Sequence, residues 1–149
     1  MPAPTIRPYE PGADTETVAT IWLDASLLAH PFLGLPLLLE HQQLVREKFL
    51  SVSENWLACC DGAPVGFISL LDESFVGGLF IAPGWQGRGI GRRLIHHALA
   101  LKGRLSLEVY LRNEQALRFY TSLGFREVSR RATDDEGLPF ENALLELSG

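Results

Sequence analysis

Apolar residues recur every three or four positions in several parts of the chain, and this spacing predicts amphipathic helices. The first such helix follows Asp14, and its apolar positions are Val18, Ile21, Trp22, Ala25 and Leu28. The second follows Gly89, and its apolar positions are Ile90, Leu94, Ile95, Ala98 and Leu101. The third follows Asn113, and its apolar positions are Ala116, Leu117, Tyr120 and Leu123. A weaker pattern over residues 37–50 predicts one more helix. Asp14 and Asn113 have side chains suited to cap the first and third helices, which they precede.

Other segments are typical of strands, because they alternate in polarity or are rich in apolar and aromatic residues. They are residues 5–10, 55–60, 64–71, 75–83, 105–111, 125–131 and 139–147. Asp61 and Gly62 supply a tight hairpin turn between the second and third of them. Gly77 and Gly78 predict a bulge or a close backbone approach in the fourth. The order β-α-α-β-β-β-α-β-α-β-β predicts an α/β fold with a mixed sheet.

Length and composition limit the class of protein. The 149 residues suit a single domain, 1–149, with one sizeable core. The longest apolar stretch, residues 27–39, is interrupted by prolines and is too short to span a membrane, and the N-terminus lacks a signal-peptide layout, so we expect a cytoplasmic protein. Two adjacent cysteines predict no disulfide framework. The net charge of −5 disfavours nucleic acid as the main partner and suits a cationic substrate.

The segment PGWQGRGIGRRLI, residues 83–95, places three alternating glycines directly before a helix. It does not match the dinucleotide fingerprint, because Arg92 stands where the third glycine is required. It does not match the P-loop either, because Ile90 stands where the lysine is required. The glycines can turn successive backbone N–H groups toward one anion, and the helix N-terminus and the neighbouring arginines add positive potential. The pattern predicts a phosphate ligand, and an unliganded glycine-rich helix entry is the alternative.

Two stretches of the sequence resemble the signatures of the GNAT N-acetyltransferase superfamily. LFIAPGWQGRGIGRRLI resembles its coenzyme A signature, a strand ending in proline and then Gln/Arg-x-x-Gly-x-Gly/Ala, with the match at residues 86–91. LEVYLRNEQALRFYTSLGF resembles its second signature, a strand, an asparagine and a helix that ends near F-Y-x-x-x-G-F. The resemblance covers nearly the whole chain and extends to small single-domain bacterial members that act on protein amines. It implies a mixed, largely antiparallel sheet flanked by about four helices, in which strands 75–83 and 105–111 separate to admit coenzyme A.

The resemblance also implies roles for individual residues. The residues expected to hold acetyl-CoA are Leu79, Phe80 and Ile81 through their backbone, then Gln86, Gly87, Arg88, Gly89, Ile90, Gly91 and Arg92 around the pyrophosphate, and Asn113 and Tyr120. Tyr120 matches the general acid that protonates the coenzyme thiolate, and a core tyrosine is the alternative. Glu108 matches a glutamate that acts as the base in relatives acetylating protein N-termini, and a solvated strand residue is an equal alternative.

A few further side chains are candidates for chemistry. His30 and Phe32 lie between the first two predicted helices, where the family's acceptor cleft is walled, and together with Glu108 they are the candidate substrate contacts. The turn residues Asp134, Asp135 and Glu136 are either solvated or attract a cationic acceptor. Cys59 and Cys60 are expected to be buried structural thiols, and an acyl-cysteine intermediate is the alternative. His96 and His97 are expected to lie on an exposed side of their helix. We expect no metal site.

We therefore expect an acetyl-CoA-dependent N-acetyltransferase in which a primary amine attacks the donor directly. A protein lysine or an N-terminal amine is the leading acceptor, and polyamines and aminoglycosides stay open. A catalytically silent acyl-CoA sensor is the main rival, although a sensor would need neither Glu108 nor Tyr120. A toxin acting on aminoacyl-tRNA would call for a basic face, which the acidic charge balance disfavours. We expect no membrane partner and a monomer or weak homodimer.

Overall fold

The computed structural model describes residues 3–134 and 137–149, so Asp135 and Glu136 lie outside the described residues. The strands are β1 (Thr5–Pro8), β2 (Glu54–Cys60), β3 (Ala63–Leu71), β4 (Phe75–Ile81), β5 (Arg104–Tyr110), β6 (Arg126–Arg131) and β7 (Asn142–Ser148). The α-helices are α1 (Thr15–Ala29), α2 (Leu35–Leu44), α3 (Leu50–Val52), α4 (Ile90–Lys102) and α5 (Glu114–Ser122). Short 3₁₀ turns lie at Pro31–Leu33 and Pro83–Trp85, and a π-helical turn at Val45–Phe49 joins α2 to α3. The order of the strands and of the longer helices is the predicted one, and the single helix predicted over residues 37–50 is divided into α2, the π-helical turn and α3.

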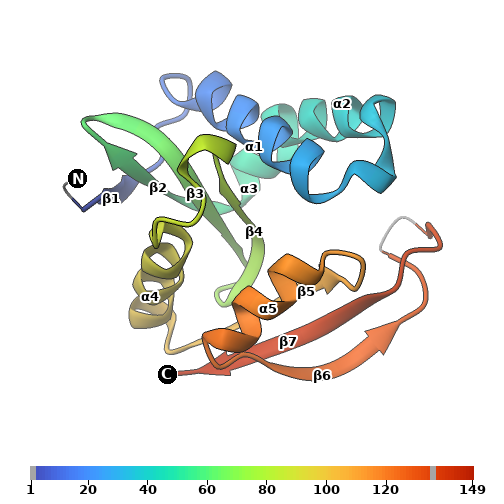
Figure 1. The fold of residues 1–149 in the computed structure, drawn as a ribbon. Helices are drawn as coiled ribbons and strands as arrows, with labels where there is room; N and C mark the ends of the chain where they lie inside the picture. The colour runs from blue at the N-terminus through green and yellow to red at the C-terminus, as the bar shows by residue number, and fades with distance from the viewer. Residues whose placement is uncertain (1–2, 135–136) are drawn as a thin grey trace.

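The sheet has seven strands in the order β1-β2-β3-β4-β5-β7-β6. Its neighbouring strands are antiparallel except for β4 and β5, which are parallel. Within the described residues, β4 and β5 pair only at Phe75↔Ser106 and Val76↔Leu107. Beyond Val76, β4 continues on β3 alone, with Leu79 opposite Ile68. The predicted largely antiparallel sheet with these two strands separating is therefore confirmed (Figure 1).

Two apolar clusters cover the two faces of the sheet. One joins the alternate β5 residues Leu105, Leu107 and Val109 to α4 and α5. The other joins α1 and α2 to Leu57 and Phe67 of β2 and β3. Figure 1 shows α1 and α2 together at the top of the view and α4 and α5 below them. Because side chains alternate along a strand, the polar positions of β5 face the α1–α2 side.

Glycines and Asp61 act in the turns as predicted. Asp61 and Gly62 have φ angles of 52° and 82°, as both central residues of a type I′ hairpin turn require. The β3–β4 register shifts so that Ser69 faces Gly78 while Leu70 faces Val76, which leaves Gly77 as the extra residue of a bulge. A Cβ atom on Gly77 would lie 3.0 Å from the Phe49 ring. The bulge and the close approach are both confirmed.

Some helix predictions are wrong in detail. Leu28 and Leu101 are 57% and 49% exposed, because each lies in the last turn of its helix, past the part that packs on the sheet. Asp14 stands at the N-cap of α1, but its carboxylate caps no first-turn N–H. It instead accepts two hydrogen bonds from Arg7, at 2.8 and 2.9 Å, and one from the N–H of Glu10 at 2.8 Å. The Arg7 guanidinium therefore holds the pKa of the Asp14 carboxyl below its usual range.

Candidate active site

The glycine loop before α4 has the backbone conformation of an anion-binding turn. Gly87 and Gly89 have φ angles of 76° and 80°, and Gly89 is the left-handed N-cap of α4. A Cβ on either residue would meet no described atom within 4 Å, so the space beside the loop is open. The N-terminus of a helix of 13 residues carries unpaired N–H groups and a positive partial charge. This loop is suited to bind phosphate oxygens through its backbone.

Side-chain contacts support the glycine loop. The Gln86 amide donates to the carbonyl of Ile81 at 3.2 Å, which ties the loop to the end of β4. Arg88 lies over the Trp85 ring at 4.9 Å. Ile90 is buried in the core, so only its backbone can reach a ligand. A Cβ on Gly91 would lie 3.1 Å from the Phe119 ring, which explains the third glycine as a contact between α4 and α5.

The end of β4 offers a free backbone edge beside this loop. Leu79, Phe80 and Ile81 pair with Ile68, Phe67 and Gly66 of β3 in an antiparallel ladder. On their other side β5 has already separated from β4. An extended ligand with amide groups can pair with such an edge as an additional strand.

Tyr120 lies on α5 in the core cluster that α4 and α5 share with the sheet. Its ring contacts the rings of Phe119 and Phe125 at centroid distances of 5.2 and 5.4 Å. Burial raises the pKa of the Tyr120 hydroxyl well above its ordinary value, because the phenolate would be poorly solvated there. The hydroxyl therefore holds its proton more tightly than an exposed tyrosine does. Asn113 begins the same helix and accepts the N–H of Ala116 at 3.2 Å, as predicted for the cap.

Glu108 lies on the other face of β5, since its neighbours Leu107 and Val109 belong to the α4–α5 cluster. It lines a hollow of about 240 Å³ on the α2 side of the sheet, at the place where β4 and β5 separate. The lining also includes His41, Phe75, Val76, Gly77, Val109, Tyr110, Arg131, Asp134 and Asn142. The carboxylate forms an ion pair with Arg131. Glu108 and Tyr120 thus lie on opposite faces of the sheet.

His30 and Phe32 lie beside this hollow in an aromatic cluster. The Tyr110 ring lies 5.2 Å from the His30 ring and 5.5 Å from the Phe32 ring. Phe32 also lines a second, outer hollow of about 650 Å³, whose lining includes Leu111, Arg112, Glu114, Pro139 and Glu141. His30 is largely buried, and burial lowers its pKa to about 4. Nε2 of the His30 ring lies 3.3 Å from the side-chain amide nitrogen of Asn113.

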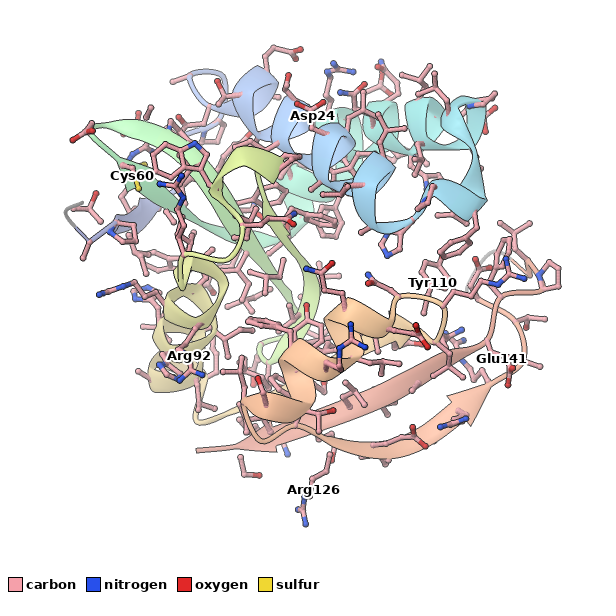
Figure 2. All side chains as sticks on the ribbon, in the orientation of Figure 1. Asp24, Cys60, Arg92, Tyr110, Arg126 and Glu141 are labelled. Carbon is pink, nitrogen blue, oxygen red and sulfur yellow. The ribbon has the colours of Figure 1, made fainter. Side chains whose placement is uncertain are left out.

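The inner hollow also contains residues that were not predicted as site residues, among them Tyr110, Arg131 and Asn142. Tyr110 could have been found, because it shares the polar face of its strand with Glu108. Arg131 and Asn142 could not, because they reach the hollow only through the pairing of β6 and β7 beside β5. Figure 2 shows Tyr110 on the right of the view and Arg92 of the glycine loop on the left.

The cysteines, two of the histidines and Asp134 are the remaining candidate residues. Cys59 and Cys60 are free thiols that pack in different clusters, as expected of neighbouring strand residues. His96 is exposed, but the prediction for His97 is wrong, because its ring packs on Trp56 at 4.5 Å. Asp134 accepts hydrogen bonds from the Tyr110 hydroxyl and the N–H of Leu138, so it is part of the hollow rather than a solvated turn.

The described part of the chain contains no cluster of three His, Cys, Asp or Glu side chains that could hold a metal ion. Every helix among the same residues is too short or too polar to span a membrane.

The fold and the glycine loop define the class of protein. Residues 51–127 match the family description "Acetyltransferase (GNAT) domain", and the chain belongs to this family. It is 32% identical over 127 residues to the peptidyl-lysine N-acetyltransferase YiaC of Escherichia coli, covering 85% of this chain and 87% of YiaC. It is 37% identical over 126 residues to the peptidyl-lysine N-acetyltransferase YjaB of the same organism, covering 84% of both.

Solved structures agree with this assignment. The solution structure of apo YjaB matches with a TM-score of 0.87 at 34% identity, covering 97% of each chain. The N-acetyltransferase PaiA of Thermoplasma acidophilum, crystallised with coenzyme A, matches with a TM-score of 0.81 over 99% of this chain and all of PaiA. At 17% identity this second likeness shows the fold alone. The protein is an acetyl-CoA-dependent N-acetyltransferase, and the resemblance stated from its sequence is confirmed.

Proposed function

We propose that this enzyme transfers the acetyl group of acetyl-CoA to the side-chain amine of a lysine in a protein. The observation that carries the proposal is the inner hollow beside the β4–β5 separation, which holds the carboxylates of Glu108 and Asp134 and the ring of Tyr110. Carboxylates and aromatic rings are groups that favour an ammonium ion. The peptidyl-lysine activity named for YiaC and YjaB supports the same acceptor.

The proposed coenzyme site is the glycine loop with the adjoining strand edge. Residues 86–92 would hold the pyrophosphate through backbone N–H groups, and open space beside Gly87 and Gly89 fits such a ligand. The backbone of Leu79, Phe80 and Ile81 would pair with the pantetheine arm, and Asn113 would contact it from α5. Acetyl-CoA supplies the reactive thioester.

Glu108 and Tyr120 would share the proton transfers. Glu108 accepts a proton from the ammonium group of the acceptor, which leaves a neutral amine. The amine nitrogen bonds to the acetyl carbon as the carbon–sulfur bond breaks, and the Tyr120 hydroxyl gives its proton to the departing sulfur. The acetylated nitrogen loses a second proton, which restores the tyrosine, and the proton on Glu108 passes to solvent. Tyr120 can supply this proton because a phenol hydroxyl carries its proton at neutral pH, as a general acid must.

We further propose that the enzyme acts in the cytoplasm, as a monomer or weak homodimer. Both described cysteines are free thiols, which is the state that a reducing compartment maintains.

An acceptor assay with matched peptides tests the proposed acceptor. One peptide carries a blocked N-terminus and a single lysine, and its partner has a free N-terminus and no lysine. We expect coenzyme A release and a mass gain of one acetyl group on the lysine peptide. Acetylation confined to the second peptide, or to spermidine or an aminoglycoside in the same assay, would contradict the proposal and identify the acceptor class.

A further inference from the structure

In the inner hollow, a carboxylate and an amide oxygen both contact the guanidinium of Arg131. Arg131, Asn142 and Tyr110 lie side by side across β6, β7 and β5, because Asn142 pairs with both of the others. Glu108 precedes Tyr110 by two positions and therefore shares its face of the sheet. The guanidinium of Arg131 lies between these residues and contacts both Glu108 and Asn142.

Asn142 is a fixed acceptor. The residue is 4% exposed, and its Nδ2 donates to the carbonyls of Thr133 at 3.0 Å and Phe140 at 3.4 Å. These bonds turn Oδ1 toward Arg131, whose Nη2 lies 3.3 Å away. A buried amide oxygen that accepts no hydrogen bond destabilises the folded protein, so Asn142 Oδ1 requires a cation or another hydrogen-bond donor in the hollow.

Tyr110 and Asp134 complete the surroundings. The Tyr110 hydroxyl donates to Asp134 Oδ2 at 3.0 Å, and Asp134 Oδ1 accepts the N–H of Leu138 at 2.9 Å. The aromatic ring is therefore held in place, and a second negative charge lies near Glu108. Glu108 and Asn142 thus form a site for positive charge that this protein fills with its own Arg131 side chain, and Asp134 adds a second carboxylate to the same hollow.

We propose that Arg131 is a displaceable internal cation that determines how strongly the enzyme binds its acceptor amine. The lysine ammonium carries the same charge on a similarly long, flexible chain, so it competes for Glu108 and Asn142. The Arg131 side chain is 46% exposed, so it can swing into solvent when the ammonium enters. Its departure also frees the Glu108 carboxylate to accept the proton. The inference rests on the proposed function, because it concerns the acceptor side of that site.

Steady-state kinetics with the blocked lysine peptide test this role. Arg131→Gln removes the internal cation, and we expect the KM for the peptide to fall about two- to five-fold with the KM for acetyl-CoA unchanged. In a Glu108→Gln background the same substitution should change the peptide KM far less, because the competition is for that carboxylate. Arg130→Gln is the matched control, since Arg130 pairs with Glu127 on the exposed edge strand and should alter neither KM.

Calorimetry with n-butylammonium, a mimic of the lysine side chain, separates this inference from the proposed function. We expect tighter binding to Arg131→Gln than to the wild type. A wild type that fails to acetylate the lysine peptide would contradict the proposed function, while butylammonium binding would still decide the role of Arg131. Unchanged or weaker butylammonium binding to Arg131→Gln would overturn the inference. A raised peptide KM would do so too, and would make Arg131 a contact for an acidic group of the acceptor.

Discussion

Nε2 of His30 lies 3.3 Å from Nδ2 of Asn113. The orientation of the amide is determined by the helix cap, because Asn113 Oδ1 accepts the N–H of Ala116. Nδ2 is therefore the donor to His30, and Nε2 of the imidazole must be its acceptor. His30 is thus a neutral imidazole with its proton on Nδ1, and it joins the end of α1 to the beginning of the helix that carries Tyr120.

This contact predicts a loss of stability in mild acid. Burial lowers the pKa of His30 from 6.5 to about 4, so between these values the unfolded chain binds a proton that the folded protein does not. The free energy of unfolding should therefore fall as the pH falls from 6.5 toward 4, by roughly 3 kcal/mol from this group. Urea denaturation at several pH values measures it.

In His30→Asn, the free energy of unfolding should lack this part of its pH dependence. His96→Gln is the control and should retain it, because His96 is exposed. Parallel pH curves for the wild type and His30→Asn would contradict the prediction. The ¹⁵N shifts of the imidazole give a second measurement, since they should report a protonated Nδ1 at neutral pH.

A second prediction concerns coenzyme binding at the glycine loop. Gly89→Glu places a negative charge in the proposed phosphate site, and acetyl-CoA affinity measured by calorimetry should fall by at least about ten-fold. The substitution also strains the backbone, because Gly89 has a φ of 80°. Gly62→Glu is the matched control, since Gly62 has a φ of 82° and equally open surroundings in the β2–β3 turn. Equal affinities in the two variants would show that the loop does not bind the coenzyme.

The parts of this structure that could be predicted from the sequence are those governed by local rules. Positive φ angles at Asp61 and Gly62 and the bulge at Gly77 follow from the residue types alone. The glycine loop could be interpreted for the same reason, because a left-handed N-cap at Gly89 is a property of a few neighbouring residues.

The acceptor side could not be predicted in this way. Arg131 is 23 residues from Glu108, and the two meet only because β7 lies between their strands. Asp14 was misjudged for a related reason, since its carboxylate turns back to Arg7 on β1 rather than toward its own helix. Ion pairs between segments depend on strand register and packing, which the spacing of apolar residues does not encode.

Tyr120→Phe tests the proposed proton donor. The ring and its contacts with Phe119 and Phe125 are retained, so acetyl-CoA affinity and thermal stability should change little. Loss of the hydroxyl should lower kcat by about 10²-fold or more, because the departing thiolate loses its proton source. Coenzyme release under saturating substrates measures kcat. A variant within a few-fold of the wild type would leave Tyr120 as a packing residue and assign the proton to another donor.

The last prediction concerns Glu108 and the pH dependence of the rate. Glu108→Gln keeps the size and polarity of the side chain and removes the base, so kcat/KM for a lysine peptide at pH 7 should fall by about 10²–10⁴-fold. Raising the pH toward 10 should recover much of this loss, because the lysine then loses its proton in solution. Glu127→Gln is the control, since that glutamate pairs with Arg130 on the exposed strand β6 and should leave the profile unchanged. A wild-type profile for Glu108→Gln would exclude the carboxylate as the base. A large loss that high pH does not recover would instead assign Glu108 to acceptor binding through its charge, beside Arg131 and Asp134 in the same hollow.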